Sequence, residues 1–233
     1  FQYYDFRFLI DFGQGQTRLV DGYLNVHYWE AAQFTAGKFK QPFSYEQLIQ
    51  DRFTPFVERS LIDQLVPARD VGVMVHGQNL LNGMLDYAAA TSNGEQNGDT
   101  DTNGAKDVTG RVALRPFEWA EDSVLRRLQI GAAIDWGNQF EPMTPQVLRT
   151  PALIPFFKFN NGVLADGRRI RWSPELAYFY RGLGVSAQYF RMDQEMRPGP
   201  AGAPSKFVID VPFEGYYAQA TYLLTGEERT TYS

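Results

Sequence analysis

The 233-residue sequence contains no cysteine and only two histidines, His27 and His76. Without cysteine there can be no disulfide framework and no thiolate metal site. The two histidines lie far apart in the sequence and lack carboxylate partners at the spacing of a ligand set. We therefore expect neither a disulfide-stapled fold nor a zinc centre.

Long apolar runs are also missing. No stretch approaches the roughly eighteen uncharged apolar residues that a transmembrane helix needs. The net charge of −5 argues against a nucleic-acid-binding protein. The mean hydropathy of −0.35 fits either a soluble protein or a membrane barrel, because lumen-facing and lipid-facing residues alternate along a barrel strand.

Catalytic signatures are absent as well. The sequence has no nucleophile elbow, phosphate-binding loop or dinucleotide-binding fingerprint. His27 could in principle join a serine and an aspartate in a triad, but no spacing in the sequence supports one. We expect no enzymatic activity and no cofactor.

Aromatic residues, in contrast, are abundant, at 15% of the chain with 18 Phe, 13 Tyr and 4 Trp. The dominant pattern has period two, as where Phe6, Phe8 and Ile10 alternate with Asp5 and Arg7. Similar runs predict about ten strands in all, near residues 20–28, 32–39, 70–77, 83–92, 108–115, 127–136, 168–181, 183–192, 207–213 and 216–224. Runs of about nine to twelve residues match tilted membrane strands and exceed the usual five or six of soluble strands. An all-β, antiparallel transmembrane β-barrel is the predicted fold.

The connections differ in length and character. Residues 13–16 and 181–182 are short, whereas residues 93–107 and 193–206 are long and polar. Short turns at one rim and long loops at the other are typical of a bacterial barrel. Residues 138–166 contain several prolines and suggest an insertion or a long loop.

Residues 41–69 interrupt the alternation with helical character. Ser44 and Gln47 resemble a capping box at a helix start. A structured loop of this length is usually functional, and in a barrel it can fold inward and narrow the channel. We predict that residues 41–69 form a constriction loop.

Several runs resemble phosphate-selective porins of the O and P type. They are AGKFKQPFSYEQL at 36–48, FVERS at 56–60, PARDVGV at 67–73, DVTGRV at 107–112 and GYYAQATYLLTGEER at 215–229. The resemblance implies a bacterial outer-membrane barrel of about sixteen strands, usually trimeric, in contact with the lipid bilayer. Because this sequence predicts only about ten strands, we expect residues 1–233 to be a single barrel domain that is incomplete at both ends.

The resemblance also implies a channel lined by arginines and a lysine cluster. The matching candidates for lining the pore and binding anions are Lys38, Lys40, Arg52, Arg59, Arg69, Arg111, Arg115, Arg127, Arg169 and Arg171. Alternation places Arg7 on the same polar face as well. Such groups would replace the hydration of a phosphate ion by charge-assisted hydrogen bonds. The loop departs from this pattern, since it also carries Glu46, Asp51, Glu58 and Asp63.

Some of these residues allow a second interpretation. Parity places Lys38 and Lys40 on the lipid side unless a bulge near Gly37 resets the register; otherwise they lie at the rim and snorkel. Arg59 could pair with Glu58 to hold the loop to the barrel wall, or contact solute directly. Arg111 and Arg115 alternate cleanly and are better lumen candidates, although such arginines often only pair with a neighbouring acid.

Two further patterns have alternative interpretations. Residues 99–104 match the first half of a calcium loop, but Gly110 stands where the loop requires a glutamate, so a solvated polar loop is the expected structure. Aromatic strand ends at 28–29, 136 and 178–180 fit girdles at the membrane interface better than sugar-stacking platforms.

Taken as a whole, the sequence predicts a passive outer-membrane porin for small hydrophilic solutes, with anions such as phosphate as the expected class. The alternative is a barrel that serves as a structural or anchoring subunit of a larger outer-membrane assembly. A soluble β-sandwich is a third possibility, which extraction without detergent would support.

Overall fold

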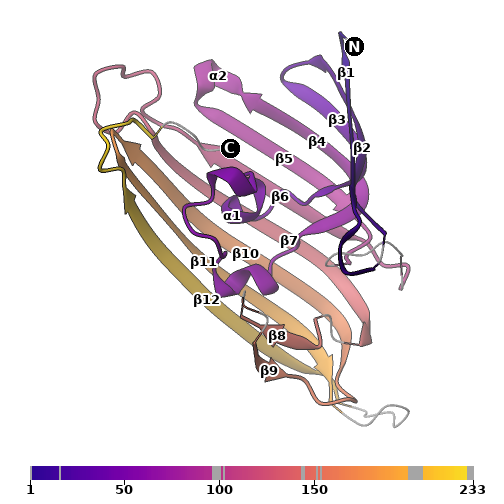
Figure 1. Ribbon diagram of the computed structural model, residues 1–233. Helices are drawn as coiled ribbons and strands as arrows, with labels where there is room; N and C mark the ends of the chain where they lie inside the picture. Colours follow the sequence, from indigo (N-terminus) through magenta and orange to yellow (C-terminus); the bar gives the residue numbers. More distant parts are fainter. Residues whose placement is uncertain are drawn as a thin grey trace.

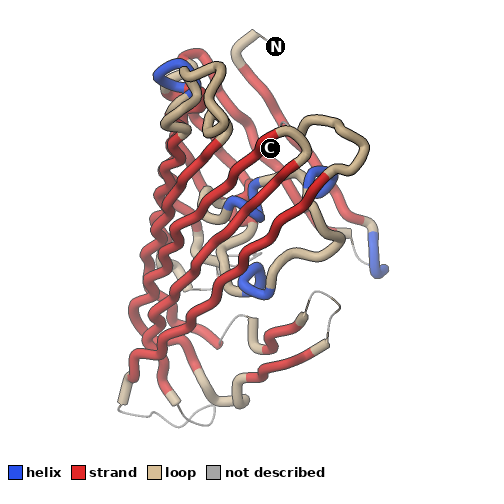
Figure 2. The backbone as a smooth tube through the Cα atoms, turned by 90° about the vertical axis from the view of Figure 1, so that its left-hand side faces the viewer, coloured by secondary structure: helices blue, strands red, loops and turns tan. Residues whose placement is uncertain are grey.

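The computed structural model describes residues 2–15, 17–95, 101, 103–142, 145–150, 152, 154–198 and 207–229. Ten long strands form a single antiparallel sheet that curves around one face (Figures 1 and 2). These strands are β1 Tyr4–Asp11, β2 Arg18–Trp29, β3 Ala32–Lys40, β4 Arg69–Asn79, β5 Leu85–Ser92, β6 Asp107–Leu114, β7 Leu128–Pro142, β10 Leu164–Tyr180, β11 Leu183–Arg197 and β12 Ile209–Tyr222. A separate hairpin contains β8 Val147–Arg149 and β9 Pro155–Lys158.

The sheet follows the chain, because each strand pairs with the next and only the β8–β9 hairpin is skipped. Within the described residues β1 pairs only with β2, and β12 only with β11, so the sheet is open. The predicted all-β antiparallel fold of about ten strands is confirmed. The prediction of separate strands at 207–213 and 216–224 is wrong, because the alternation continues through Glu214 and Gly215 into one strand.

The convex face of the sheet carries a continuous apolar band. In register across four strands lie Ile130, Leu176, Ala187 and Ala218, all of them outward-facing. On the first strands, aromatic and aliphatic residues occupy the same face and are exposed; they include Phe6, Phe8, Leu24, Phe34, Val73 and Val75. A face of this composition fits hydrocarbon better than water.

Two rows of outward aromatic residues border this band. One row consists of Trp136, Trp172, Tyr189 and Tyr216. In it the centroids of the Trp172 and Tyr189 rings lie 5.3 Å apart. Tyr28, Tyr180 and Tyr222 lie toward the opposite strand ends. Both rows suit the aromatic girdles that the sequence predicts.

One residue of the predicted girdle faces the other way. Phe179 is buried on the concave side, where it packs with Tyr45, Ile49 and Ala177. Alternation explains the difference, since Tyr178 and Tyr180 point outward and the residue between them must point inward.

The outward face of the longest strands continues past the first aromatic row. Beyond Tyr189, β11 presents Arg191 and Asp193, and Arg191 also pairs with Glu214 of β12 at 2.7 Å. Here the outer surface is charged instead of apolar. The apolar band therefore ends where the aromatic row predicts an interface.

The predicted sorting of short and long connections holds only in part. The antiparallel order places residues 30–31, 80–84, 115–127 and 181–182 at one rim, and the remaining connections at the other. Residues 115–127 are long, and the short connection 12–17 lies at the rim of the long ones. The expected insertion at 138–166 is shorter, since β7 continues to Pro142 and β10 begins at Leu164. Across the described ranges no helix is both long enough and apolar enough to cross a membrane.

Candidate functional site

Residues 41–69 lie on the concave face of the sheet (Figure 1). They contain α1, Tyr45–Leu48, and two short 3₁₀ turns at Asp51–Phe53 and Leu61–Gln64. The main buried cluster of the protein joins this segment to the far wall; its members are Phe43, Ile62, Val66, Ala133, Phe190 and Met192. The Phe43 and Phe190 rings meet edge to face with centroids 6.1 Å apart. The segment is thus packed against β7 and β11 from inside.

Polar contacts also hold the segment to the wall. Ser44 Oγ donates to Gln188 Oε1 at 3.0 Å, and the Tyr45 backbone N–H donates to Glu175 at 2.8 Å. The predicted capping box is wrong, because the Ser44 side chain makes no capping hydrogen bond at α1 and its hydroxyl bonds to Gln188 of the wall instead. Gln47 likewise donates to Asp63 at 2.5 Å and does not reach back to Ser44.

Arg59 bonds within the segment and not to the barrel wall. Its guanidinium lies 2.5 Å from Asp51 and 4.0 Å from Asp63, and Glu58 is exposed. The predicted pair with Glu58 is therefore wrong, because two other acids of the segment surround the guanidinium. Burial raises the pKa of the Asp63 carboxyl to about 6, and Arg59 partly opposes the shift.

A cavity of about 690 Å³ lies between the segment and the β1–β5 part of the sheet. Among the described residues, its charged lining consists of Arg7, Lys40, Arg52, Arg69 and Arg111 together with Asp5, Asp21, Asp51 and Asp86. The wall is polar and mixed in charge, with one more cation than acid. Four of the predicted pore-lining residues meet here, namely Lys40, Arg52, Arg69 and Arg111.

The cations of this cavity differ in how they are held. Lys40 Nζ donates to the backbone carbonyls of Gln47 at 2.6 Å and Ile49 at 3.3 Å, which uses two of the three ammonium donors. Arg52 is exposed and lies over the Phe53 ring at 4.6 Å. Arg69 and Arg7 share the carboxylate of Asp21, at 2.7 and 3.0 Å.

Lys38 does not lie at an exposed rim. The residue is 4% exposed, although it pairs in register with Gly22 and Val71. The backbone at Gly37 has a φ of 127°, but the pairing of β3 with β4 continues without a shift. A Cβ at Gly37 would come within 2.2 Å of the Gly22 carbonyl oxygen, so glycine allows the two strands to approach closely here.

Arg111, Arg115 and Arg127 are each paired with an acid, which stands on a strand for Arg111 and Arg115 and beyond the end of β12 for Arg127. Arg111 pairs with Glu175, and its Nε donates to that carboxylate at 3.0 Å. Arg115 binds both oxygens of Asp86, at 2.7 and 2.8 Å, and also donates to the Gly83 carbonyl at 2.5 Å. The partner of Arg127 is Glu228, at 3.2 Å.

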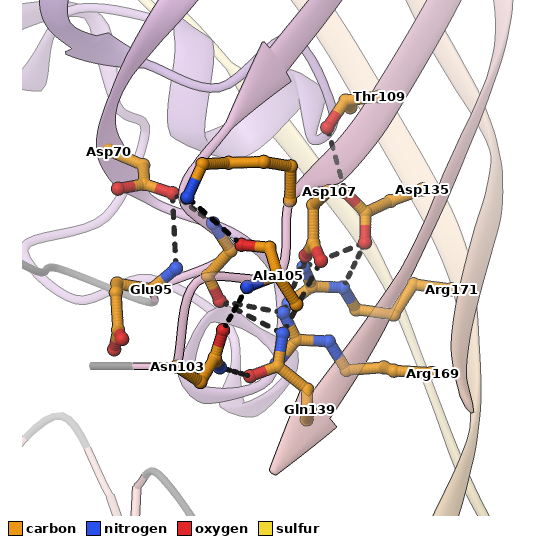
Figure 3. Close-up of polar contacts among 12 residues, drawn as sticks. Asp70, Glu95, Asn103, Ala105, Asp107, Thr109, Asp135, Gln139, Arg169 and Arg171 are labelled. Carbon is orange, nitrogen blue, oxygen red and sulfur yellow. Dashed lines mark hydrogen bonds and ion pairs between the residues drawn. The ribbon is translucent and has the colours of Figure 1, made fainter. Parts of the chain in front are cut away.

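Arg169 and Arg171 belong to a buried network (Figure 3). Asp107 accepts from both arginines, at 2.5 and 3.1 Å, and is 1% exposed. Asp135 accepts from Arg171 and from the Thr109 hydroxyl, each at 2.7 Å. Because charges so deeply buried must be paired, these arginines hold β6, β7 and β10 together.

The same network reaches the connection after β5. Arg169 donates to the Gly94 carbonyl at 2.8 Å, and Asn103 donates to Gln139 at 3.3 Å. Asp70 accepts from the N–H groups of Gly94 and Glu95, at 2.6 and 3.0 Å. Both ends of this connection are therefore fixed to the inner wall.

Sequence reasoning missed the acids. All the predicted site residues are cations, yet four acids each form an ion pair with one or more arginines. These acids are Asp21, Asp107, Asp135 and Glu175. Alternation could have found the acids, because each stands at an inward position of its strand. Alternation could not have predicted which arginine pairs with which acid, since some partners lie two strands apart in the sheet.

Metal binding has no support in the described parts of the chain, where no group of three His, Asp or Glu side chains could hold an ion. Of the possible calcium loop, Asp101 accepts from the Gly104 N–H at 2.9 Å and pairs with Lys106, while Asp99 lies outside the described residues. His27 does have a carboxylate neighbour, Asp5 at 3.3 Å, which the sequence spacing did not reveal.

Comparison with known proteins fits this architecture. Residues 2–120, just over half of the 233 residues, match the family described as phosphate-selective porin O and P. A search of curated proteins found no significant match. The matched family is one of bacterial outer-membrane channels, not of enzymes, and gives no support to an anchoring subunit. With its ten-stranded antiparallel sheet and its inward segment, the chain belongs to the phosphate-selective porin O and P family of outer-membrane porins.

Proposed function

We propose that this porin conducts small hydrophilic anions, phosphate among them, by passive diffusion past a constriction formed by residues 41–69. The observation that carries the proposal is the cavity of about 690 Å³ beside that segment, with its five basic side chains. Flux follows the solute gradient and involves no covalent step. Selectivity comes from the width of the opening and from the charges around it.

The charges favour anions only modestly. Five cations face four acids around the cavity, and a mixed wall of this kind gives a weaker preference than a purely basic one. Lys40 bonds to backbone carbonyls and Arg52 lies over an aromatic ring, whereas the other three cations pair with carboxylates. Lys40 and Arg52 are therefore the groups best able to replace water around a phosphate ion.

Planar-bilayer recording tests the function. The expected result is an ohmic conductance, an anion-selective reversal potential in asymmetric KCl, and block of the chloride current by millimolar phosphate. Lys40→Gln should weaken the phosphate block, whereas Arg191→Gln, on the outward charged surface, should leave it unchanged. A conductance that prefers cations removes phosphate from the proposal, and the absence of conductance removes the channel.

We also propose that the protein is a homotrimer in the outer membrane, as the family resemblance implies. The mass of the detergent-extracted protein by light scattering, corrected for bound detergent, tests this assembly. Three copies are expected, and a monomeric mass contradicts the proposal.

A further inference from the structure

We infer that Glu175 is a positioning residue of the pore, which holds residues 41–69 against the wall and cancels the charge that Arg111 presents to the cavity. Only the part about the charge of Arg111 rests on the proposed function. Glu175 is on β10, outside the cavity lining, and its side chain is 2% exposed. It therefore acts through its two partners and does not touch solute.

The two carboxylate oxygens of Glu175 have different partners. Oε1 accepts from the Arg111 guanidinium of β6, whose Nε lies 3.0 Å away. Oε2 accepts from the backbone N–H of Tyr45, the first residue of α1, at 2.8 Å. One buried carboxylate thus joins the sheet wall, a cavity-lining cation and the inward segment.

Gly131 makes this reach possible. Glu175 lies opposite Gly131 of β7 in the strand register, while Arg111 is one strand further, on β6. A Cβ at Gly131 would stand 2.6 Å from Glu175 Oε1 and 2.9 Å from Glu175 Cγ. Any other residue at this position would displace the carboxylate, so glycine leaves the path over β7 open.

The charge has a consequence for ion selection. Arg111 lines the cavity, and its positive charge is offset by Glu175 underneath. Glu175→Gln keeps the shape of the side chain but leaves Arg111 without a counter-charge from this position. We expect the anion-to-cation permeability ratio to rise roughly twofold, the effect of a unit charge about 10 Å from a monovalent ion in water once salt screening is included.

The segment can be followed independently of conductance. The chain has no cysteine, and Val57, on residues 41–69, is fully exposed at 104%. A spin label on Val57→Cys therefore reports the mobility of the segment without disturbing its packing. The label should become more mobile in Glu175→Gln, because an amide cannot satisfy both Arg111 and the Tyr45 N–H as a carboxylate does.

Three variants separate position from charge. Gly131→Ala should raise label mobility but leave the permeability ratio within about 1.3-fold of wild type, because no charge is removed. Gly110→Ala is the matched control, since its Cβ would meet Ile134 at an ordinary 3.9 Å and neither readout should change. Arg111→Gln should lower the permeability ratio and leave the label as in wild type.

The inference is overturned if Glu175→Gln leaves either the label mobility or the permeability ratio at the wild-type value. If the wild-type protein does not conduct, the proposed function fails, and the label measurements still decide whether Glu175 holds the segment.

Discussion

Arginines occur in two different settings inside this protein. On β10, Arg169 and Arg171 are buried with carboxylates of β6 and β7, as Arg171 is between Asp107 and Asp135. Around the cavity beside β1–β5, Arg52 faces solvent and Lys40 bonds to backbone carbonyls, whereas the other three basic groups pair with carboxylates. Positive side chains therefore stabilise the wall formed by β6, β7 and β10, whereas beside β1–β5 they contribute to the electrostatic potential of the cavity. Burial and the nearest acid, not residue identity, separate the two roles.

The strongest way to test the structural wall is to remove its central acid. Asp107→Asn should lower the free energy of unfolding by about 3–5 kcal/mol, because Arg169 and Arg171 are left buried with too little negative charge. Urea unfolding of the protein folded in lipid vesicles, followed by tryptophan fluorescence, measures the loss. Asp193→Asn, in a half-exposed outward pair with Arg191, should cost less, on the order of 1 kcal/mol. Equal effects of the two substitutions would contradict the division.

The second test concerns the apolar attachment of residues 41–69. Phe43→Ala should weaken docking of the segment by about 3 kcal/mol, since the fully buried ring packs on Phe190. Limited proteolysis in detergent should then cleave within 41–69 while the strands stay protected. Phe56→Ala, whose ring is exposed, should leave the cleavage rate as in wild type. Resistance of Phe43→Ala to protease would show that polar contacts alone hold the segment.

Asp63 makes the segment sensitive to pH. Its folded pKa, raised to about 6 by burial, lies above the ordinary value of 3.8, so the docked segment favours the protonated form. The resulting stabilisation is fully present below about pH 4 and is lost as the pH rises through about 6, with a size on the order of 3 kcal/mol.

A label on the segment should accordingly become more mobile between about pH 4 and about pH 7. Arg59, Glu46, Gln47 and Lys40 surround the carboxyl, and all but Glu46 oppose the shift. Asp63→Asn should abolish the pH dependence and keep the hydrogen bond from Gln47. A persistent dependence in that variant would assign it to another group.

The smallest expected effect tests the cavity wall. Arg52→Gln should reduce the anion-to-cation permeability ratio by roughly twofold, the screened effect of one charge at about 10 Å in water, without changing the urea midpoint. Arg126→Gln, in an exposed pair with Glu118 on the connection 115–127, is the matched control. A lower urea midpoint in Arg52→Gln would instead show that Arg52 stabilises the fold, as Arg169 and Arg171 do.

Much of the sheet could be predicted from the sequence, because each strand shows the period-two alternation of its two faces. The same pattern places Arg111 and Arg171 on the inner face. It could not pair Arg111 with Glu175, because that contact crosses β7 and depends on the absence of a side chain at Gly131.

Local signals were less reliable where tertiary contacts compete with them. Ser44 has the sequence of a helix cap, but its hydroxyl reaches Gln188, 144 positions away. Lys38 follows the outward parity of its strand, yet its side chain is buried next to the irregular backbone of Gly37. In both cases long-range packing determines the outcome, and a single sequence does not contain that information.

The attachment of residues 41–69 also constrains the order in which the protein can fold. Adjacent strands can pair as local hairpins, but Tyr45 and Ser44 contact partners 130 and 144 positions further along the chain. Contacts of such high sequence separation carry the largest loop-closure entropy and form late. We therefore expect the wall of β10 and β11 to be in place before residues 41–69 dock, so that the attachment of this segment is one of the last steps of folding.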